Sequence, residues 1–456
     1  MAIDRSRLPD VGRDPAFTFP DVVRHRLSNG LDLRTIEHHT VPVVTFVLQV
    51  AGGAGADRPD GEGLAAITAD MLDEGTGSLS ALDVSDAMAR LGGDYELDVG
   101  PDATVLGLTT VTRFAARGAA LLADMTLRPS LRESDFDRVR QLRLDRLRQL
   151  KDLAPAVADR AFLRKLYGDH PYGHLSIGNA EALARLSVDD VAAFHAASFR
   201  PAAATMVMAG AMSHAEMCAI AEDAFGSWTS GGGASMPAAA DIEPQVGRSS
   251  RLVVIPREGA AQSELRIGHL AARRSTPDYA ALLVMNAVLG GQFVSRVNLK
   301  LREEKGYTYG ARTGFDWRKG LSPFMLQASV QTGATADAIK DSLAELEGIR
   351  DSRPPTPEEL SLAKASLTRG YPRNFETAQQ VARSVSQLAL HGLPDTYFAE
   401  FVPKVSAVSG AEVSAAAARY LNPAQATTLV VGDRAAFGDT LQALGLGEPE
   451  LLPAEQ

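Results

Sequence analysis

One pattern occurs twice in this chain, as LSVDDVAAFHAASFRPAAATMVMAG in residues 186–210 and as VSGAEVSAAAARYLNPAQATTLVVG in residues 408–432. The two copies align without a gap at an offset of 222 residues and share five identical positions besides alanines. Each copy predicts a helix that begins at a capping serine, a turn at a proline and an apolar strand. The identical pairs other than alanine are Ser187 and Ser409, Val191 and Val413, Pro201 and Pro423, Thr205 and Thr427, and Gly210 and Gly432.

A second, weaker repeat has an offset of 215 residues. Ala65, Ala66 and Gly75 recur as Ala280, Ala281 and Gly290, and we expect both stretches to be apolar helices that end at the glycine. Chance is an alternative explanation in an alanine-rich chain. The gapless first repeat favours a duplicated domain, because a period of about 220 residues is too long for a solenoid.

A stretch near the midpoint predicts the boundary between the two copies. Residues 230–247 are rich in glycine, alanine and proline and contain few large apolar side chains. Such a composition is typical of a linker. We therefore expect an N-terminal domain over residues 1–229 and a C-terminal domain over residues 248–456.

The second half mixes strands and helices without strict alternation. Thr356-Pro357-Glu358-Glu359 predicts a helix start, with a threonine cap, proline at the first helical position and a glutamate that closes a capping box. Strands grouped in hairpins and followed by runs of helices predict an α+β fold, in which helices cover one face of a mostly antiparallel sheet. The expected strands are 251–256, 264–270, 307–317 and 323–332, and the first helix is 278–289.

Composition limits the classes of function. The 456 residues carry 46 Lys and Arg against 56 Asp and Glu, and a net charge of −10 argues against a nucleic-acid partner. Cys218 is the one cysteine, so no intramolecular disulfide is possible and a reducing compartment fits. The N-terminal stretch lacks the apolar core of a signal peptide, and no run of about 18 apolar residues occurs. We expect a cytoplasmic protein without a membrane partner.

The histidines give no convincing metal site. His170 and His174 have helical i, i+4 spacing, but Pro171 and Gly173 would break a helix, so we expect a loop after a helix over residues 157–167.

Two other histidine pairs are equally weak candidates. His38 and His39 follow a predicted strand, where adjacent side chains point to opposite faces. His214 and Cys218 share a helix face but lack a third ligand nearby, which favours a surface histidine and a small buried thiol.

The most informative segment is residues 63–76, GLAAITADMLDEGT. It resembles the zinc helix of the pitrilysin, insulinase and mitochondrial processing peptidase family, in which Gly-Leu-Ala precedes an inverted H-x-x-E-H motif and Gly-Thr follows. Ala66, Ala69 and Asp70 occupy the positions of the first histidine, the catalytic glutamate and the second histidine. The family's distal acidic ligand would fall in residues 140–150, where Asp145 is the one carboxylate. The resemblance therefore implies that this chain holds no metal, because one aspartate cannot replace two imidazoles and a distal carboxylate.

A segment of the second half, residues 290–309, resembles another motif of the same family. It matches the Gly-Gly, Ser-Arg-Leu and Leu-Arg-Glu-x-x-Gly-x-x-Tyr sequence, whose arginine and tyrosine bind substrate and help to stabilise the transition state. Arg302 and Tyr309 occupy those two positions. A guanidinium and a phenol are donors that suit a peptide carbonyl gaining negative charge. The alternative is that Arg302 pairs with Glu303 or Glu304 and that Tyr309 is a strand aromatic.

The resemblance covers nearly the whole chain, since it also includes Leu27–Leu31 at the first hairpin and residues 170–173. It implies the zinc-lacking subunit of a heterodimeric metallopeptidase, in which a homologous H-x-x-E-H subunit holds the zinc and the substrate is a peptide or an unfolded protein. Alternatives are a structural subunit and a peptide-binding protein without protease function.

Overall fold

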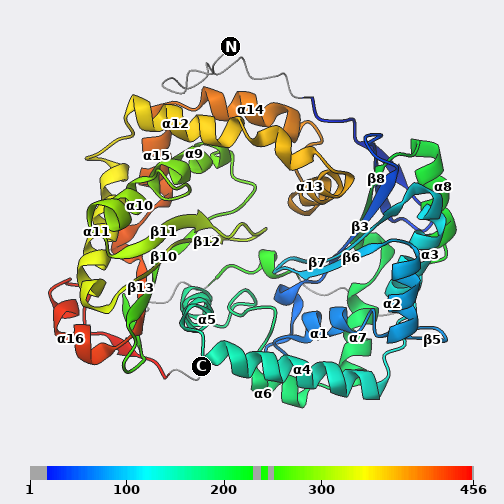
Figure 1. Ribbon diagram of the computed structural model, residues 1–456, viewed down its shortest axis with the longest axis horizontal. Coiled ribbons are helices and arrows are strands. Elements are labelled where there is room, and N and C mark those ends of the chain that lie inside the picture. The colour runs from blue at the N-terminus through cyan, green and yellow to red at the C-terminus, as the bar shows by residue number, and fades with distance from the viewer. Residues whose placement is uncertain (1–17, 230–237, 245–250, 454–456) are drawn as a thin grey trace, which may run out of the picture.

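The computed structural model describes residues 18–229, 238–244 and 251–453, and each half of the chain contributes one six-stranded sheet (Figure 1). The first sheet consists of β1 (Val23–Arg26), β2 (Asp32–Glu37), β3 (Val43–Ala51), β6 (Asp94–Val99), β7 (Ala103–Val111) and β8 (Ala204–Gly210). The second consists of β9 (Leu252–Pro256), β10 (Gln262–Ala272), β11 (Thr308–Phe315), β12 (Ser322–Gln331), β13 (Thr427–Gly432) and β14 (Glu450–Leu451).

The two sheets have the same strand order. The first runs β1-β2-β8-β3-β7-β6, and the second, read in the same direction, runs β14-β9-β13-β10-β12-β11. In both, the strand pair β2 with β8, or β9 with β13, is parallel, and the three following pairs are antiparallel. The predicted duplication and the α+β fold with mostly antiparallel sheets are confirmed.

The repeated segment forms the same elements twice. Helices α7 (Val188–Ser198) and α15 (Gly410–Tyr420) both begin at a serine whose side chain accepts a hydrogen bond from the third helical residue. A 3₁₀ turn at Pro201 or Pro423 follows, and the chain then enters β8 or β13. These local signals suffice because a cap, a proline turn and an apolar strand are each specified by neighbouring residues.

The second repeat predicted a helix that ends at a glycine in each copy, and this prediction is confirmed in one copy and wrong in the other. Helix α9 (Tyr279–Leu289) ends at Gly290 as expected, but α1 (Leu64–Asp70) ends five residues before Gly75. Gly75 lies instead in β4 (Gly75–Thr76), which pairs with β5 (Leu79–Ser80), and has a φ of +135°. An added Cβ there would lie 2.7 Å from the Leu79 carbonyl oxygen, so the glycine permits this close pairing rather than a helix cap.

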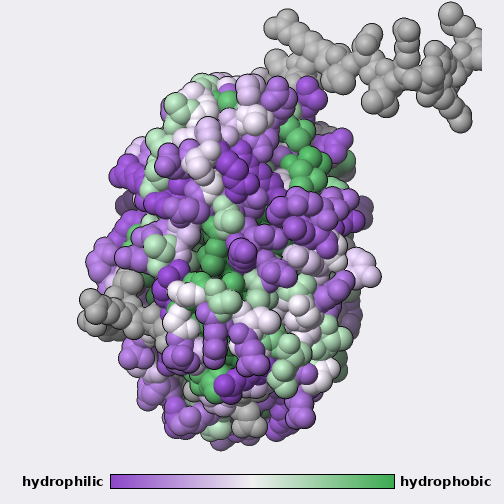
Figure 2. Space-filling view, turned by 90° about the vertical axis from the view of Figure 1, so that its left-hand side faces the viewer, coloured by the Kyte–Doolittle hydropathy of each residue, from purple (hydrophilic) through white to green (hydrophobic). Residues whose placement is uncertain are grey.

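Helices of each half cover one face of their own sheet. In the first half, side chains of α2 (Ala81–Arg90), α3 (Ala115–Leu127) and α8 (His214–Phe225) pack with the apolar face of the strands. In the second half, α9, α11 (Thr335–Arg350), α12 (Pro357–Thr368), α15 and α16 (Arg434–Gln442) do the same. Figure 2 shows the outer side of this second layer, where hydrophilic residues cover most of the surface and hydrophobic ones are visible in a hollow. The helices are thus amphipathic and bury their apolar stripes against the sheet.

The opposite face of each sheet is covered by a helix from the other half, which the sequence analysis did not predict. Helix α13 (Ala378–His391) packs on β3 and β8 of the first sheet, where Val381 meets residues such as Val47 and Val207 in one cluster. Helix α5 (Ala154–Tyr167) packs on β10 and β13 of the second sheet, with Phe162 in the same cluster as Leu429. Each half thus covers one face of its own sheet with its own helices, as predicted, and the opposite face is covered by a helix from the other half, because that apolar face also needs burial.

The other predicted elements lie close to their expected positions, and the capping box of Thr356 and Glu359 opens α12 as predicted. Only residues 238–244 of the proposed linker are described, and they include a 3₁₀ turn with buried alanines at 239 and 240. The domain boundary at residues 230–247 stays a prediction. The remaining helices are α4 (Glu133–Lys151), α6 (Ala180–Arg185), α10 (Arg296–Asn298) and α14 (Tyr397–Ala407).

Candidate functional site: a degenerate zinc helix and an exposed arginine and tyrosine

A buried carboxylate holds the start of helix α1. Asp57 accepts hydrogen bonds of 2.7 Å from the backbone N–H groups of Gly63 and Ala65, and so satisfies donors at the helix N-terminus. Gly63 has a φ of +101°, which allows the chain to turn into the helix at this point. Burial raises the pKa of Asp57 to about 7, although its two N–H donors act in the opposite direction.

The first two motif positions of α1 are part of the hydrophobic interior. Ala66 and Ala69 are 3% and 0% exposed, so their methyl groups are packed and leave no space for a larger side chain without movement of the neighbours. Neither residue carries an atom that can bind a metal or accept a proton.

The third motif position is occupied by an ion pair. Asp70 is half-buried, and its Oδ2 lies 2.6 Å from Nε of Arg143 on α4. The Arg143 side chain is largely buried. A guanidinium from the helix that would supply the distal ligand therefore stands beside the position of the second histidine.

Asp145 faces a different direction from Arg143. Its Oδ1 accepts a hydrogen bond of 3.0 Å from Gln141 and also pairs with Arg148, both on the same helix. Because residues two apart on a helix point about 200° apart, one of the two positions faces α1 and the other faces away. The residue that faces α1 is Arg143, which the sequence analysis did not single out.

Further ionisable groups surround Asp70. Burial, with a contribution from the neighbouring Glu74, raises the pKa of Asp73 to about 6. Tyr95 of β6 has a buried hydroxyl without a hydrogen-bond partner among the described residues. Burial, together with the charges of Asp73 and Asp70, raises the pKa of this phenol, so it is neutral at physiological pH. Glu74 pairs with Arg138 of α4.

These residues do not fit a zinc ion. Alanine at positions 66 and 69 offers no ligand atom, and the Asp70 carboxylate is engaged by a cation. In the part of the chain that the structure describes, no group of three or more His, Cys, Asp or Glu side chains is placed to hold a metal. The absence of a bound metal ion in solution stays a prediction.

Arg302 lies in a π-helical turn, Leu299–Glu304, that directly follows α10. Such turns are frequent at functional sites. The guanidinium carbon lies 4.4 Å from the ring centroid of Phe293, and Nε lies 3.5 Å from the Glu303 carboxylate. The pairing with Glu303 that the sequence left open as an alternative is thus present, and the aromatic ring holds the guanidinium from one side.

Tyr309 projects from a bulge in the edge strand β11. The register between β11 and β12 shifts between Thr308 and Ala311, which places Tyr309 in the bulged stretch. The Thr308 hydroxyl bonds to the carbonyl oxygens of Gly310, at 2.9 Å, and Ser329, at 2.6 Å. Tyr309 is 91% exposed, and a bulge is a common means of directing a side chain outward.

Asn298 connects the loop that carries Phe293 to strand β11. Its side-chain amide donates to the Phe293 carbonyl oxygen at 2.8 Å, and its Oδ1 accepts from the backbone N–H of Ala311 at 3.0 Å. Asn298 is buried and so fixes both segments. It stands four residues before Arg302, and its identity alone gave no sign of this role.

The two sets of predicted residues lie in different halves of the molecule. Figure 1 places α1 and α4 in the lower right and α10 and β11 on the left. No hydrogen bond or ion pair among the described residues links Arg302 or Tyr309 with Asp70. A single copy of the chain therefore does not bring these residues together into one site.

Among the described residues, no histidine belongs to a group of three or more side chains that could hold a metal. His170 and His174 lie in the loop after α5, as predicted. His170 is buried and stacks on Tyr167, while His174 Nε2 lies 3.9 Å from Asp57. Cys218 is half-buried rather than buried, and its Sγ lies 3.5 Å from Nε2 of His214.

His38 and His39 follow the end of β2. His39 Nε2 lies 3.2 Å from the carboxylate of Glu37, the last residue of that strand.

Comparison with known families decides which family this is. A family model described as Insulinase (Peptidase family M16) matches residues 34–178, and one described as Peptidase M16 inactive domain matches residues 185–367. The chain belongs to peptidase family M16. The resemblance recognised from the sequence is confirmed, and this M16 member carries an inactive-type domain in a family of zinc proteases.

Several relatives and solved structures are similar to this M16 chain. An uncharacterized zinc protease of Mycobacterium leprae is 26% identical over 359 residues, 76% of this chain and 78% of the relative. A probable mitochondrial-processing peptidase subunit beta of Schizosaccharomyces pombe is 24% identical, over 62% of each chain. The structure of a peptidase M16 inactive domain from Pseudomonas fluorescens shares the fold with a TM-score of 0.84 at 23% identity, covering 91% of this chain and 98% of that one. A protease from Helicobacter pylori has a TM-score of 0.82 at 18% identity, covering 90% and 99%.

Within the described residues of this M16 protein, every helix is too short or too polar to cross a lipid bilayer.

Proposed function

We propose that this chain is the zinc-lacking subunit of a heterodimeric M16 peptidase and that it supplies Arg302 and Tyr309 to the active site of a homologous H-x-x-E-H subunit. The observation that carries the proposal is the exposure of Tyr309. This side chain lies on a bulged edge strand, is 91% exposed and follows Arg302 by seven residues. A large aromatic side chain that projects this far into solvent is more typical of a binding surface than of a fold-stabilising position.

The chemistry of the two side chains suits a peptide whose carbonyl gains charge. Arg302 rests against Phe293 and Glu303, contacts that orient the guanidinium. In the proposed complex the guanidinium binds a substrate carbonyl, and the Tyr309 hydroxyl donates a hydrogen bond to the developing oxyanion. A zinc ion held by the partner would polarise the scissile carbonyl and lower the pKa of a bound water.

The pair of Asp70 and Arg143 supports this division of roles. A cation of this chain already occupies the region next to the degenerate motif, so the first half contributes no second metal centre. The complex then contains one complete site, to which the partner contributes the metal and this chain contributes the two donors. The substrate is a peptide or an unfolded protein segment, and hydrolysis of its peptide bond needs both subunits. A cytoplasmic location belongs to the same proposal, since a single cysteine fits a reducing compartment.

Reconstitution tests the proposal. The partner to be tested is an M16 chain of the same organism that carries H-x-x-E-H and lacks the arginine and tyrosine pair, and the neighbouring genes are the first place to search for it. We expect each purified subunit to be inactive on a fluorogenic peptide, a 1:1 complex in sedimentation, and activity only after mixing. A partner in which the motif glutamate is replaced by glutamine is the control, and its complex should form without activity.

Two outcomes would contradict the proposal. Full activity of the partner alone would remove this chain from the mechanism. A 1:1 complex whose rate is unaffected by changes at Arg302 and Tyr309 would favour the alternative, a structural or peptide-binding subunit.

A further inference from the structure

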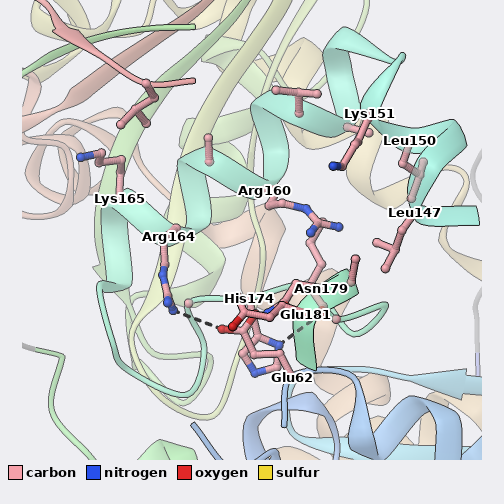
Figure 3. Close-up of a pocket in the computed structure, with 18 residues that line it drawn as sticks. Glu62, Leu147, Leu150, Lys151, Arg160, Arg164, Lys165, His174, Asn179 and Glu181 are labelled. Carbon is pink, nitrogen blue, oxygen red and sulfur yellow. Dashed lines mark hydrogen bonds and ion pairs between the residues drawn. The ribbon is translucent and has the colours of Figure 1, made fainter. Parts of the chain in front are cut away.

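A cavity of about 660 Å³ lies apart from both sets of residues described above. It is lined by the C-terminal end of α4, one side of α5, the loop of residues 173–179 and the start of α6, and Leu452 of the second half also lines it (Figure 3). This volume is within the range of about 300–1,000 Å³ that is typical of small-molecule sites. The cavity can therefore accept a ligand of metabolite size.

The carboxylates of the cavity are already engaged by neighbouring side chains. Glu62 accepts a hydrogen bond of 2.7 Å from Asn179 and one of 3.3 Å from Arg164, as the dashed lines in Figure 3 show. Glu181 is paired at 2.6 Å with Arg185, which lies outside the cavity. Both acidic groups thus already have a hydrogen-bonded or ion-paired partner.

Two cations of the cavity have no such partner. Figure 3 shows Lys151 of α4 and Arg160 of α5 with their nitrogen atoms directed toward the same space. Neither side chain makes a hydrogen bond or ion pair with another described residue, whereas Lys165 on the same helix pairs with Glu450. The Glu62 carboxylate acts on the charge of Arg160 but accepts its hydrogen bonds from Asn179 and Arg164, and an anion placed near Lys151 and Arg160 would be attracted by both cations.

Arg160 is half-buried, which makes its lack of a partner costly. Burial lowers the pKa of Arg160, although the nearby Glu62 carboxylate partly opposes this effect. A guanidinium stays charged in proteins, so the group cannot avoid the cost by losing its proton. An oxyanion could accept two charge-assisted hydrogen bonds from the Arg160 guanidinium, and such bidentate bonds are stronger than those between neutral groups.

Part of the cavity wall is apolar. Leu147 and Leu150 extend from the same turn of α4 as Lys151, and Leu175 and Val157 contribute from the loop and from α5. A free inorganic anion would leave this surface in contact with water. A ligand with an anionic head and a short aliphatic part would cover it, at about 25 cal/mol per Å² of apolar area buried.

We infer that this cavity is a binding site for a small organic oxyanion, a carboxylate or phosphate monoester, whose head lies between Lys151 and Arg160 and whose aliphatic part lies on Leu147 and Leu150. The site is independent of the proposed peptidase function. It joins α4, which carries Arg143, to α5, which packs on the sheet of the other half.

Calorimetric titration of the full chain with four probes tests this site. Hexanoate and hexyl phosphate carry both the head and the aliphatic part, inorganic phosphate carries the head alone, and hexanol carries the aliphatic part alone. We expect both amphipathic anions to bind more tightly than phosphate or hexanol, and the tighter of the two identifies the head group. Binding of hexanol as tight as that of hexanoate, or no binding of any probe, would overturn the inference.

Variants separate the cavity from general electrostatic attraction. Arg160→Gln should weaken binding of the tighter amphipathic probe by about 10–100-fold, the effect of losing a hydrogen bond to a charged group. Lys151→Gln, at an exposed helix end where folding is not at risk, should weaken it by about tenfold. Arg146→Gln removes an equal charge from the same helix outside the cavity and should leave affinity unchanged. Equal affinity of all three variants and the wild type would refute the assignment.

Discussion

Nε of Arg143 lies 2.6 Å from Oδ2 of Asp70, so that a guanidinium of α4 stands next to the position that holds a zinc ligand in the family motif. The negative charge of Asp70, which would otherwise be half-buried beside Asp73 and Glu74, is thereby neutralised. The degenerate motif is thus tied to α4 by an ion pair.

The first prediction concerns the strength of this pair. Asp70→Ala should lower the free energy of unfolding by about 1–2 kcal/mol, between the values for exposed and for fully buried pairs, because Arg143 is largely buried and Asp70 is partly exposed. Urea denaturation measures this change.

The matched control is Asp145→Ala, which removes an exposed carboxylate two residues from Arg143 on the same helix. It should change stability by less than about 0.5 kcal/mol. A cycle with Arg143→Met should give a coupling energy close to the loss for Asp70→Ala. If the two aspartate variants lowered the free energy of unfolding equally, the ion pair would stabilise the fold no more than an exposed carboxylate does.

The second prediction is that restoring the motif does not restore zinc binding. Ala66→His, Ala69→Glu and Asp70→His together introduce large side chains at two fully packed positions and leave Arg143 without its partner. Overpacking should cost about 1–3 kcal/mol at each alanine position, and the guanidinium should repel a cation. Metal analysis after dialysis and a thermal melt measure the two effects.

Arg143→Glu added to the triple variant is the informative comparison. It removes the repulsive charge and supplies a carboxylate from the helix that carries the distal ligand in the family. We expect the quadruple variant to bind zinc more tightly than the triple variant. Stoichiometric zinc in the triple variant alone would show that Arg143 does not exclude the metal.

Local sequence signals predicted much of the fold. The capping serines at 187 and 409 and the threonine at 356 specify their helices through contacts within four residues, and the structure has capping boxes at all three. The exchange of α5 and α13 between the halves could not be predicted in this way. Both helices have apolar faces, but which sheet such a face covers depends on contacts between residues far apart in the chain.

In the candidate site, too, the sequence predicted some features and could not predict others. The loss of the zinc ligands follows from the identities of Ala66 and Ala69, and the spacing of Arg302 and Tyr309 from the family motif. The sequence did not distinguish Arg143 from Asp145, because that choice depends on the rotation of α4 about its axis.

The third prediction is a pH dependence that originates at Asp57. Its carboxyl group has a folded-state pKa of about 7, above the ordinary value of 3.8, so the folded protein binds more protons than the unfolded chain between these pH values. The contribution of this group to stability is therefore complete below about pH 4 and is lost as pH rises toward 7. The loss is at most about 1.4 kcal/mol per pH unit, the limit for one proton.

Comparison with Asp57→Asn isolates this contribution from the other carboxylates. The asparagine keeps one acceptor for the N–H groups of Gly63 and Ala65 but has no proton to lose. The stability advantage of the wild type over the variant should fall between pH 4 and pH 7 and be constant above. An advantage that grows with pH would mean that the two N–H donors outweigh burial and that the pKa of Asp57 is lowered.

The fourth prediction separates the roles of Arg302 and Tyr309 in the reconstituted complex. Tyr309→Phe should lower kcat by about 10²–10³-fold, the usual effect of removing a donor to an oxyanion. Arg302→Ala should act mainly by raising KM, since the guanidinium binds substrate before the reaction as well as during it. Steady-state kinetics on mixed subunits measures both values, with complex formation checked by sedimentation.

Tyr307→Phe is the matched control for Tyr309→Phe. Tyr307 precedes the bulge by one residue and packs against the core of the second half, while Tyr309 points into solvent. Removing the Tyr307 hydroxyl should leave kcat and KM near the wild-type values. Because Arg302 and Tyr309 act on one peptide, the double variant should lose less than the product of the two single losses. Near-wild-type rates for both single variants would assign the pair to the surface of a scaffold, where Arg302 serves only to pack against Phe293.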